Sequence, residues 1–289
     1  MRVGTPAISP SNALYRARKR TNVLVLCISA FALAFGLFWL IWILGTLFYE
    51  GGHALARLTF YFEMTPPPGA DGGMANAIAG SAMLIFVGTL LGTPIGILAG
   101  TYLAEYGKRR WLAAATRFLN DVLLSAPSIV IGLFVYSVYV ARVKHFSGWA
   151  GAVALSLIVI PVVVRTTDDM LKLVPSSLRE AAVALGCPMW KMIVSISYRA
   201  ASTGILTGVL LAVARISGET APLLFTVLNN QFWSLNMNAP MSNLPMVIFQ
   251  FAMSPYPDWH RLAWGGAALI TFAVLILNII ARSLFRKRD

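Results

Sequence analysis

Charged residues are scarce in this sequence. Asp, Glu, Lys and Arg make up only 12% of its 289 residues, whereas hydrophobic residues make up 58%. A soluble domain carries about 25% charged residues. The composition therefore excludes an ordinary soluble domain and is typical of a protein that crosses a membrane several times.

Cysteine and histidine are also rare. The two cysteines, Cys27 and Cys187, lie too far apart in the sequence to suggest a disulfide framework. His53, His145 and His260 lack the spacing of metal ligands, and no glycine-rich segment has the Gly-Lys-Ser/Thr ending of a phosphate-binding loop. We therefore expect no bound metal, no cofactor on this chain and no catalytic site.

Long apolar segments dominate what is present. Six of them have roughly the 20 residues that a helix needs to cross a bilayer: residues 23–48, 76–104, 118–141, 149–165, 203–228 and 262–284. Because the backbone must satisfy its own hydrogen bonds in hydrocarbon, we expect an all-α polytopic membrane protein with six transmembrane helices.

The same segments predict how the chain is organised. The first apolar run is longer than the core of a signal peptide, which has about 7–15 residues, so we expect it to remain as a transmembrane helix. The expected parts are a tail at 1–22, an accessory first helix at 23–48, a periplasmic loop at 49–75, a membrane core at 76–284 that includes a loop at 166–201, and a tail at 285–289.

Basic residues concentrate in alternate connections between these spans. The rich segments contain Arg2, Arg16, Arg18, Lys19 and Arg20, then Lys108, Arg109, Arg110 and Arg117, then Lys172, Arg179, Lys191 and Arg199, and finally Arg282, Arg286, Lys287 and Arg288. Cytoplasmic loops carry such an excess, so both termini are predicted to be cytoplasmic. The net charge of +12 then reflects topology and requires no nucleic-acid partner.

Arg215 and Glu219 are charged residues inside the fifth apolar segment. They are four residues apart and hence on one face of a helix. In a helix that begins near Thr203, Arg215 lies about 18 Å along the axis, close to the middle of the membrane. An isolated arginine there costs about 2.5–3.5 kcal/mol, so a compensating partner is required. The pair is either a neutral contact with another subunit or part of an anion pathway, since a guanidinium suits phosphate oxygens.

The remaining acidic residues near the spans have simpler explanations. Glu105, Asp121, Asp168 and Asp169 are expected at cytoplasmic helix ends, where water or a helix terminus satisfies them. Among the loops, residues 246–253 are apolar and are expected to form a short helix. The loop 166–201 contains helix-forming residues up to Leu185, a plausible helix end at Gly186, and a second short helix over residues 190–196. Two short helices that meet at a glycine make a projection suited to a groove on a partner.

The sequence of this loop, Glu180-Ala181-Ala182-x3-Gly186-x9-Ile196, resembles the EAA motif of binding-protein-dependent ABC importer permeases. Further segments resemble the A-type permease subunits of phosphate ABC importers. They are residues 94–98, 102–107, 126–133, 215–223 and 254–257. The resemblance covers most of the chain, from about residue 72 to residue 284.

The resemblance implies a type I importer permease in a bacterial inner membrane, without catalysis of its own. It implies a heterodimer with a homologous permease, two copies of an ATPase that hold ATP and Mg, and a periplasmic phosphate-binding protein. Arg215, Glu219 and Thr220 would lie in the substrate pathway, and Glu180, Ala181, Ala182 and Gly186 would couple to the ATPase. The alternatives are a permease for another cargo, namely sulfate, molybdate or an amino acid, an ATP-independent anion channel subunit, and a structural subunit of a membrane assembly.

Overall fold

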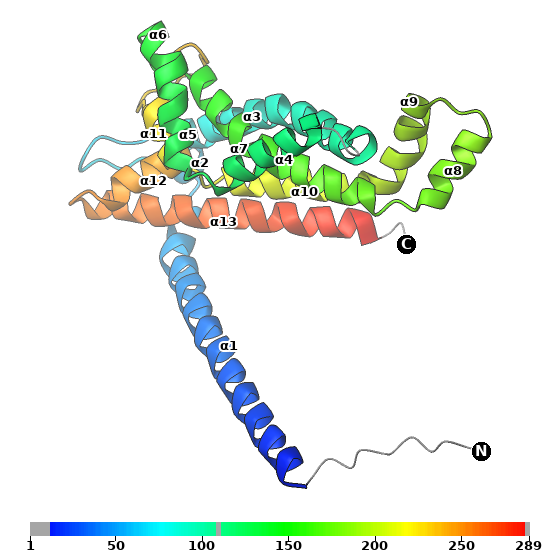
Figure 1. Ribbon diagram of the computed structural model, residues 1–289. Helices are drawn as coiled ribbons and strands as arrows, with labels where there is room; N and C mark the ends of the chain where they lie inside the picture. Colours follow the sequence, from blue (N-terminus) through cyan, green and yellow to red (C-terminus); the bar gives the residue numbers. More distant parts are fainter. Residues whose placement is uncertain (1–11, 108–110, 287–289) are drawn as a thin grey trace, which may run out of the picture. The chain divides into compact units, whose positions relative to one another are not determined.

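The computed structural model describes residues 12–107 and 111–286, and all regular secondary structure in these stretches is helical (Figure 1). The all-α class predicted from the sequence is therefore confirmed. The chain divides into two compact units, residues 1–49 and residues 50–289. Several basic residues used for the orientation prediction lie outside the described residues: Arg2, Lys108, Arg109, Arg110, Lys287 and Arg288.

The described part of the first unit is helix α1 (Asn12–Leu55) up to residue 49. None of the residues in its most apolar 18-residue window is buried. Aromatic rings follow one another along it, with the rings of Phe31 and Phe35 stacked at 6.4 Å and those of Phe35 and Trp39 edge to face at 6.2 Å. Its apolar side chains lie on all sides of the helix, as expected for a membrane-spanning helix.

The second unit is built around α7 (Gly148–Lys172), whose apolar window is 72% buried. Helix α3 (Ala75–Thr101) runs parallel to it, and the contact is made by glycines spaced four residues apart. A Cβ atom at Gly88 would lie 2.9 Å from Leu155 Cβ, and one at Gly96 would lie 2.7 Å from Val163 Cβ. Only glycine permits so close an approach of two helices, so the glycine face of α3 is what admits α7.

Two further long helices complete the bundle (Figure 1). Helix α10 (Tyr198–Ile216) runs antiparallel to α7, because Gly204 meets Met170 and Gly208 meets Thr166. Helix α13 (Pro257–Arg286) packs on α10 and on α12 (Leu244–Ala252). Helix α12 is the short helix expected within residues 246–253, and its Phe251 ring stacks on Trp259 of α13 at 4.4 Å.

The start of the second unit packs at one end of this bundle. A Cβ atom at Gly51, in the last residues of α1, would lie 2.6 Å from Ala268 Cβ of α13. The short helix α2 (Thr59–Phe62) follows. Asn76, at the start of α3, then ties the loop together: its amide oxygen accepts from the Thr65 N–H at 3.1 Å, and its Nδ2 donates to the Gln231 carbonyl at 2.9 Å.

The third expected span is not one continuous helix. Residues 118–141 are divided between α4 (Trp111–Ser125) and α5 (Ser128–Val135), which meet at 106°. The chain continues as a π-helical turn η2 (Tyr136–Val140) and α6 (Ala141–Val143). The cause of the break is Pro127, which is extended at ψ 134° and disfavours a helical conformation in the residue before it.

The fourth and fifth spans also differ from expectation. Helix α7 continues to Lys172, so the first seven residues of the predicted loop 166–201 are helical. The expected helix 203–228 is wrong as a single element: α10 ends at Ile216 and α11 (Ala221–Thr226) begins after a turn. Pro222 stands in the first turn of α11, where its missing N–H suits the start of a new helix. Among the described residues, five helices and the bent α4–α5 pair are long and apolar enough to span a membrane.

Candidate functional site

The charged pair Arg215–Glu219 lies at the end of a helix. Arg215 is in the last turn of α10, whereas Glu219 lies in the turn between α10 and α11. Their side chains nevertheless face each other, with Arg215 Nε 4.0 Å from Glu219 Oε1. The two predicted site residues are thus brought together, although they do not share a continuous helix.

The height of this pair in the bundle follows from the packing of α10 on α7. Gly208 meets Thr166, and the same antiparallel register continued toward the end of α10 brings Ile216 level with Ile158. Both isoleucines belong to one buried cluster. Ile158 is close to the middle of the 25-residue helix α7, so Arg215 lies at mid-height of the most buried span.

The exposure of the pair leaves room for a ligand. The Arg215 side chain is 39% exposed and that of Glu219 is 16% exposed. The contact with Glu219 is made through Nε, and the Nη1 and Nη2 groups of a guanidinium form the fork that binds tetrahedral oxyanions. Thr220 is half-buried and follows Glu219 directly, at the N-cap position of α11. The arrangement can hold an anion beside a carboxylate.

The element that positions this turn is α11. A Cβ atom at Gly132 of α5 would lie 2.6 Å from the Pro222 Cα atom. On the other side, Leu223 and Val227 contact Gly151 of α7. The segment after Glu219 is therefore held by α5 and α7.

The loop with the EAA motif contains two short helices at one end of the bundle (Figure 1). They are α8 (Ser176–Ala184) and α9 (Met189–Met192), and α9 continues through a π-helical turn η3 (Ile193–Ser197) into α10. This organisation confirms the predicted pair of short helices.

Gly186 ends α8 as the sequence predicts. Its φ is +77°, a left-handed conformation that glycine adopts without a Cβ penalty. The Gly186 N–H donates to the Val183 carbonyl at 2.9 Å, and the Cys187 N–H donates to the Ala182 carbonyl at 3.1 Å. This is the Schellman arrangement, which satisfies the last carbonyls of the helix.

The motif residues divide into a packed residue and exposed ones. Ala182 is buried against Met192 and Ile193, so a small residue is required there. Glu180 and Ala181 are exposed. The loop also exposes large apolar side chains, those of Leu178, Val183, Leu185, Met189, Trp190 and Val194. An exposed apolar patch of this kind marks an interaction surface.

Two acidic residues were explained wrongly from the sequence. Glu105 lies in a π-helical turn η1 (Tyr102–Tyr106) at the end of α3, and its side chain is only 4% exposed because it pairs with Arg179 at 3.0 Å. Asp168 is buried in α7 and pairs with Lys172 at 2.6 Å and Arg117 at 3.8 Å. Ion pairs therefore hold the Glu105 carboxylate and the Oδ2 atom of Asp168, whereas Asp168 Oδ1 is buried without a hydrogen-bond partner among the described residues. Spacing gives no signal for the Glu105 pair, since 74 residues separate its partners.

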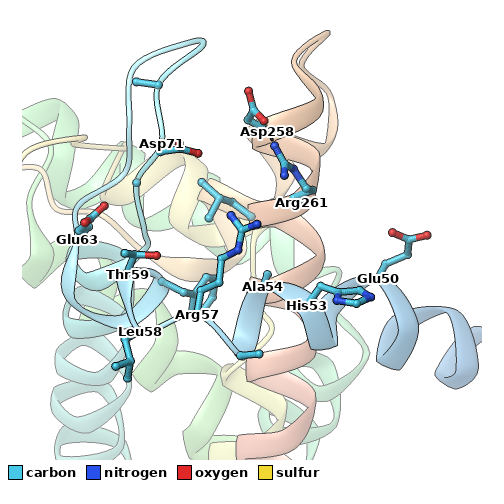
Figure 2. Close-up of a pocket in the computed structure, with 15 residues that line it drawn as sticks. Glu50, His53, Ala54, Arg57, Leu58, Thr59, Glu63, Asp71, Asp258 and Arg261 are labelled. Carbon is cyan, nitrogen blue, oxygen red and sulfur yellow. Dashed lines mark hydrogen bonds and ion pairs between the residues drawn. The ribbon is translucent and has the colours of Figure 1, made fainter.

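A pocket of about 790 Å³ opens beside the start of α13 (Figure 2), whereas α8 lies at the other end of that helix (Figure 1). Arg57 and Arg261 line it, and Arg261 pairs with Asp258. Carboxylates outnumber the arginines in its lining: Glu50, Glu63, Asp71 and Asp258. Because this surplus repels anions, the pocket is a poor resting place for an oxyanion, and the pair at mid-height is the better candidate.

Comparison with known proteins gives matches over most of the chain. Residues 92–287 match the family model of the binding-protein-dependent transport system inner membrane component. The phosphate transport system permease protein PstA of Pasteurella multocida is 64% identical over 279 residues, which cover 96% of this chain and 99% of that protein. PstA of Haemophilus influenzae is 61% identical and covers 96% of this chain and 98% of its own. PstA 1 of Mycobacterium tuberculosis is 38% identical, with 84% and 80% covered.

Solved structures share the fold at low sequence identity. The MetNI methionine ABC transporter in an inward-facing conformation aligns with a TM-score of 0.60 and 16% identity, over 74% of this chain and 96% of that chain. A bacterial ABC transporter involved in the import of alginate aligns with a TM-score of 0.56 and 12% identity, over 96% and 100%. These likenesses concern the arrangement of helices.

Proposed function

Because this chain belongs to the family of binding-protein-dependent transport system inner membrane components, we propose that it is the permease subunit of an ATP-driven importer of inorganic phosphate. It has the all-α fold of type I ABC importer permeases and is a multi-pass membrane protein. It is not an enzyme, since ATP hydrolysis in such transporters resides on a separate subunit. Relatives named as phosphate permeases, 54–64% identical over at least 94% of the chain, support phosphate as the cargo.

The observation that carries the site assignment is the Arg215–Glu219 pair at mid-height of the bundle, with Arg215 exposed and Glu219 partly exposed. Arg215 receives the phosphate oxygens through its guanidinium fork. Glu219 accepts a hydrogen bond from the protonated oxygen of hydrogen phosphate, which favours this anion over fully deprotonated oxyanions. Thr220 adds a hydroxyl next to the carboxylate.

Coupling to ATP hydrolysis runs through the loop of α8 and α9. Glu180 and Ala181 are exposed, as are the apolar side chains of Leu185 and Trp190 in the same loop, and this surface docks into the ATPase. Ala182 and Gly186 give the loop its shape, through tight packing and through the left-handed helix end. Closure of the ATPase would then displace this loop.

The assembly has the composition of an ABC importer. The partners are a second, homologous permease, two copies of the ATPase, which carry ATP and Mg, and a periplasmic phosphate-binding protein. Both termini and the loop of α8 and α9 face the cytoplasm, in agreement with the basic residues around them. The pocket lined by Arg57 and Arg261 then faces the periplasm of a bacterial inner membrane. Residues 23–48 are an accessory helix, residues 49–75 a periplasmic loop, and residues 76–284 the permease core.

Uptake of labelled phosphate into vesicles that carry the full complex tests the proposal. Wild-type vesicles should accumulate phosphate only with ATP, and unlabelled phosphate should compete better than sulfate, molybdate or an amino acid. Arg215→Gln should abolish uptake while the complex remains assembled. Arg199→Gln, which changes an exposed arginine at the other end of α10, is the matched control.

The contrary outcomes are distinct. Accumulation without ATP would indicate an anion channel, and better competition by sulfate or molybdate would indicate another cargo. Uptake unchanged by Arg215→Gln would remove this residue from the pathway. Loss of the whole complex in that variant would make the pair a structural contact between subunits.

A further inference from the structure

The ion pair between Glu105 and Arg179 joins two elements that the chain does not connect directly. Glu105 belongs to η1 at the end of α3, and Arg179 belongs to α8. Arg179 Nη2 lies 3.0 Å from Glu105 Oε1 and also donates to the Leu171 carbonyl of α7 at 2.6 Å. One guanidinium group thus binds α3 and α7 to the loop helix.

The pair is well shielded from water. The Glu105 side chain is 4% exposed and that of Arg179 is 22% exposed. Removing charges from water is costly, and a buried ion pair often adds little net stability compared with apolar side chains of similar size. The ion pair fixes the position of α8 relative to η1. Separating the two elements would leave a buried charge without its partner, which is strongly unfavourable.

Chain connectivity explains why this link matters. Only residues 173–175 separate α7 from α8, and α8 leads through α9 and η3 into α10. A displacement of α8 therefore reaches α7 and α10 along the backbone. Helix α3 has no such backbone connection to α8. Its polar contacts with α8 and α10 in the described residues are Glu105 to Arg179 and Thr101 Oγ1 to the Tyr198 hydroxyl at 2.9 Å. Ile97 and Ala104 add apolar packing against the ends of α7 and α10.

Both links involve π-helical turns. Glu105 lies within η1, and Tyr198 directly follows η3. Such turns interrupt the regular hydrogen-bond ladder of a helix and occur often at functional sites. Here they stand at the two points where the spans meet the loop of α8 and α9.

We propose that Arg179 is a positioning residue for transport, which fastens the coupling helix α8 to α3 through Glu105 and so makes α3 move with the ATPase. This proposal rests on the proposed function for the role of the loop. Since α3 packs on α7 along its glycine face, the fastened helices would move together around the mid-height site.

The test measures phosphate uptake and ATP hydrolysis together in proteoliposomes with the full complex. Arg179→Gln should lower the phosphate taken up per ATP hydrolysed by about tenfold, within the range of coupling energies found for residues between two sites. Hydrolysis itself should persist. Arg179→Lys keeps the charge and should retain more of the coupling, and Arg199→Gln should behave as wild type.

Glu105→Gln tests whether Arg179 acts through Glu105. If the two residues act through each other, the double variant Glu105→Gln/Arg179→Gln should be no worse than Arg179→Gln alone. Additive losses would show that each residue acts separately and would overturn the proposal. Uptake and hydrolysis that fall in proportion would likewise overturn it, since they indicate a merely structural role.

A distance measurement that does not depend on the transported substrate tests the role of Arg179 independently of whether phosphate is the cargo. Spin labels at Leu98 on α3 and Leu275 on α13, both exposed, are placed in a background with Cys27→Ser and Cys187→Ser. Trapping the ATPase with ATP and vanadate should change the distance between the labels in the wild-type complex, and Arg179→Gln should remove this change. An equal change in the variant, or none in the wild type, refutes the link. If the distance between the labels changes only when Arg179 is present but the complex takes up no phosphate, the link stands and only phosphate as the cargo is refuted.

Discussion

Gly100→Ala is a direct test of the close contact between α3 and α7. A Cβ atom at Gly100 would lie 2.7 Å from the Thr167 Cβ atom and 2.7 Å from the Val164 carbonyl oxygen. Ordinary contacts of this kind are several tenths of an ångström longer. Neither neighbouring atom can rotate away, because one belongs to the backbone and the other is a β-carbon. The helices must therefore move apart.

The size of the effect follows from two opposing terms. Overpacking a close contact costs about 1–3 kcal/mol, and rigid neighbours favour the upper half of this range. Replacing glycine by alanine inside a helix returns up to about 1 kcal/mol. The expected net loss is about 1–2 kcal/mol, which corresponds to a fall in melting temperature of roughly 2–8 °C for a chain of this size.

Thermal melting of the purified full complex measures this loss. Gly52→Ala is the control, because it lies in α1 within the second unit and a Cβ atom there has nothing within 4 Å. Gly92→Ala should fall between the two, since its nearest atoms are 3.0 Å away. Equal melting temperatures for Gly100→Ala and Gly52→Ala would refute the close packing of α3 on α7.

Two further variants probe the loops. Gly186→Arg places a charged side chain on the exposed surface of the loop of α8 and α9 and imposes a left-handed conformation on a non-glycine residue. Phosphate uptake per ATP hydrolysed should fall in the assembled complex, and normal uptake would contradict the proposed docking surface. Asn76→Ala leaves the buried Thr65 N–H without its acceptor and removes a donor to the Gln231 carbonyl. It should cost about 1–3 kcal/mol in a melting experiment, and wild-type stability would show that water replaces the amide.

Sequence patterns predicted the long elements because hydropathy and length decide them. The runs that became α3 and α13 required only an apolar stretch with few charges. The glycines of α3 are spaced four residues apart and therefore share one helix face, and the structure places α7 on that face. The helix end at Gly186 could be predicted because a glycine with a proline two residues later, here Pro188, is a strong local signal for a helix end.

The breaks within the third and fifth spans were missed because hydropathy does not register them. Ala126-Pro127 and the turn before Pro222 lie between apolar residues, so an average over the segment stays high. A local signal existed in both places. Pro127 restricts the residue before it, and Thr220 with Pro222 two residues later is the pattern of a helix start.

The ion pairs of Glu105 and Asp168 could be predicted less well. Lys172 is four residues from Asp168, so helical spacing offered that partner. Arg117 and Arg179 approach their acidic partners only after α4 and α8 have packed on the long spans. Such contacts depend on tertiary structure, and a single sequence carries no periodicity that reports them.

The turn after Ile216 places Arg215 and Glu219 in different elements, although it leaves their side chains close enough to interact. Arg215 belongs to α10, whose other end continues from the loop of α8 and α9 through η3. Glu219 lies beyond the end of that helix, in a turn that leads into α11, where Pro222 packs on Gly132 of α5. The pair therefore spans two elements with different neighbours, so its 4.0 Å separation depends on how α10 stands relative to α11. A pair within one rigid helix would have no such dependence, and this difference makes Arg215 and Glu219 suited to respond to the loop that α10 follows.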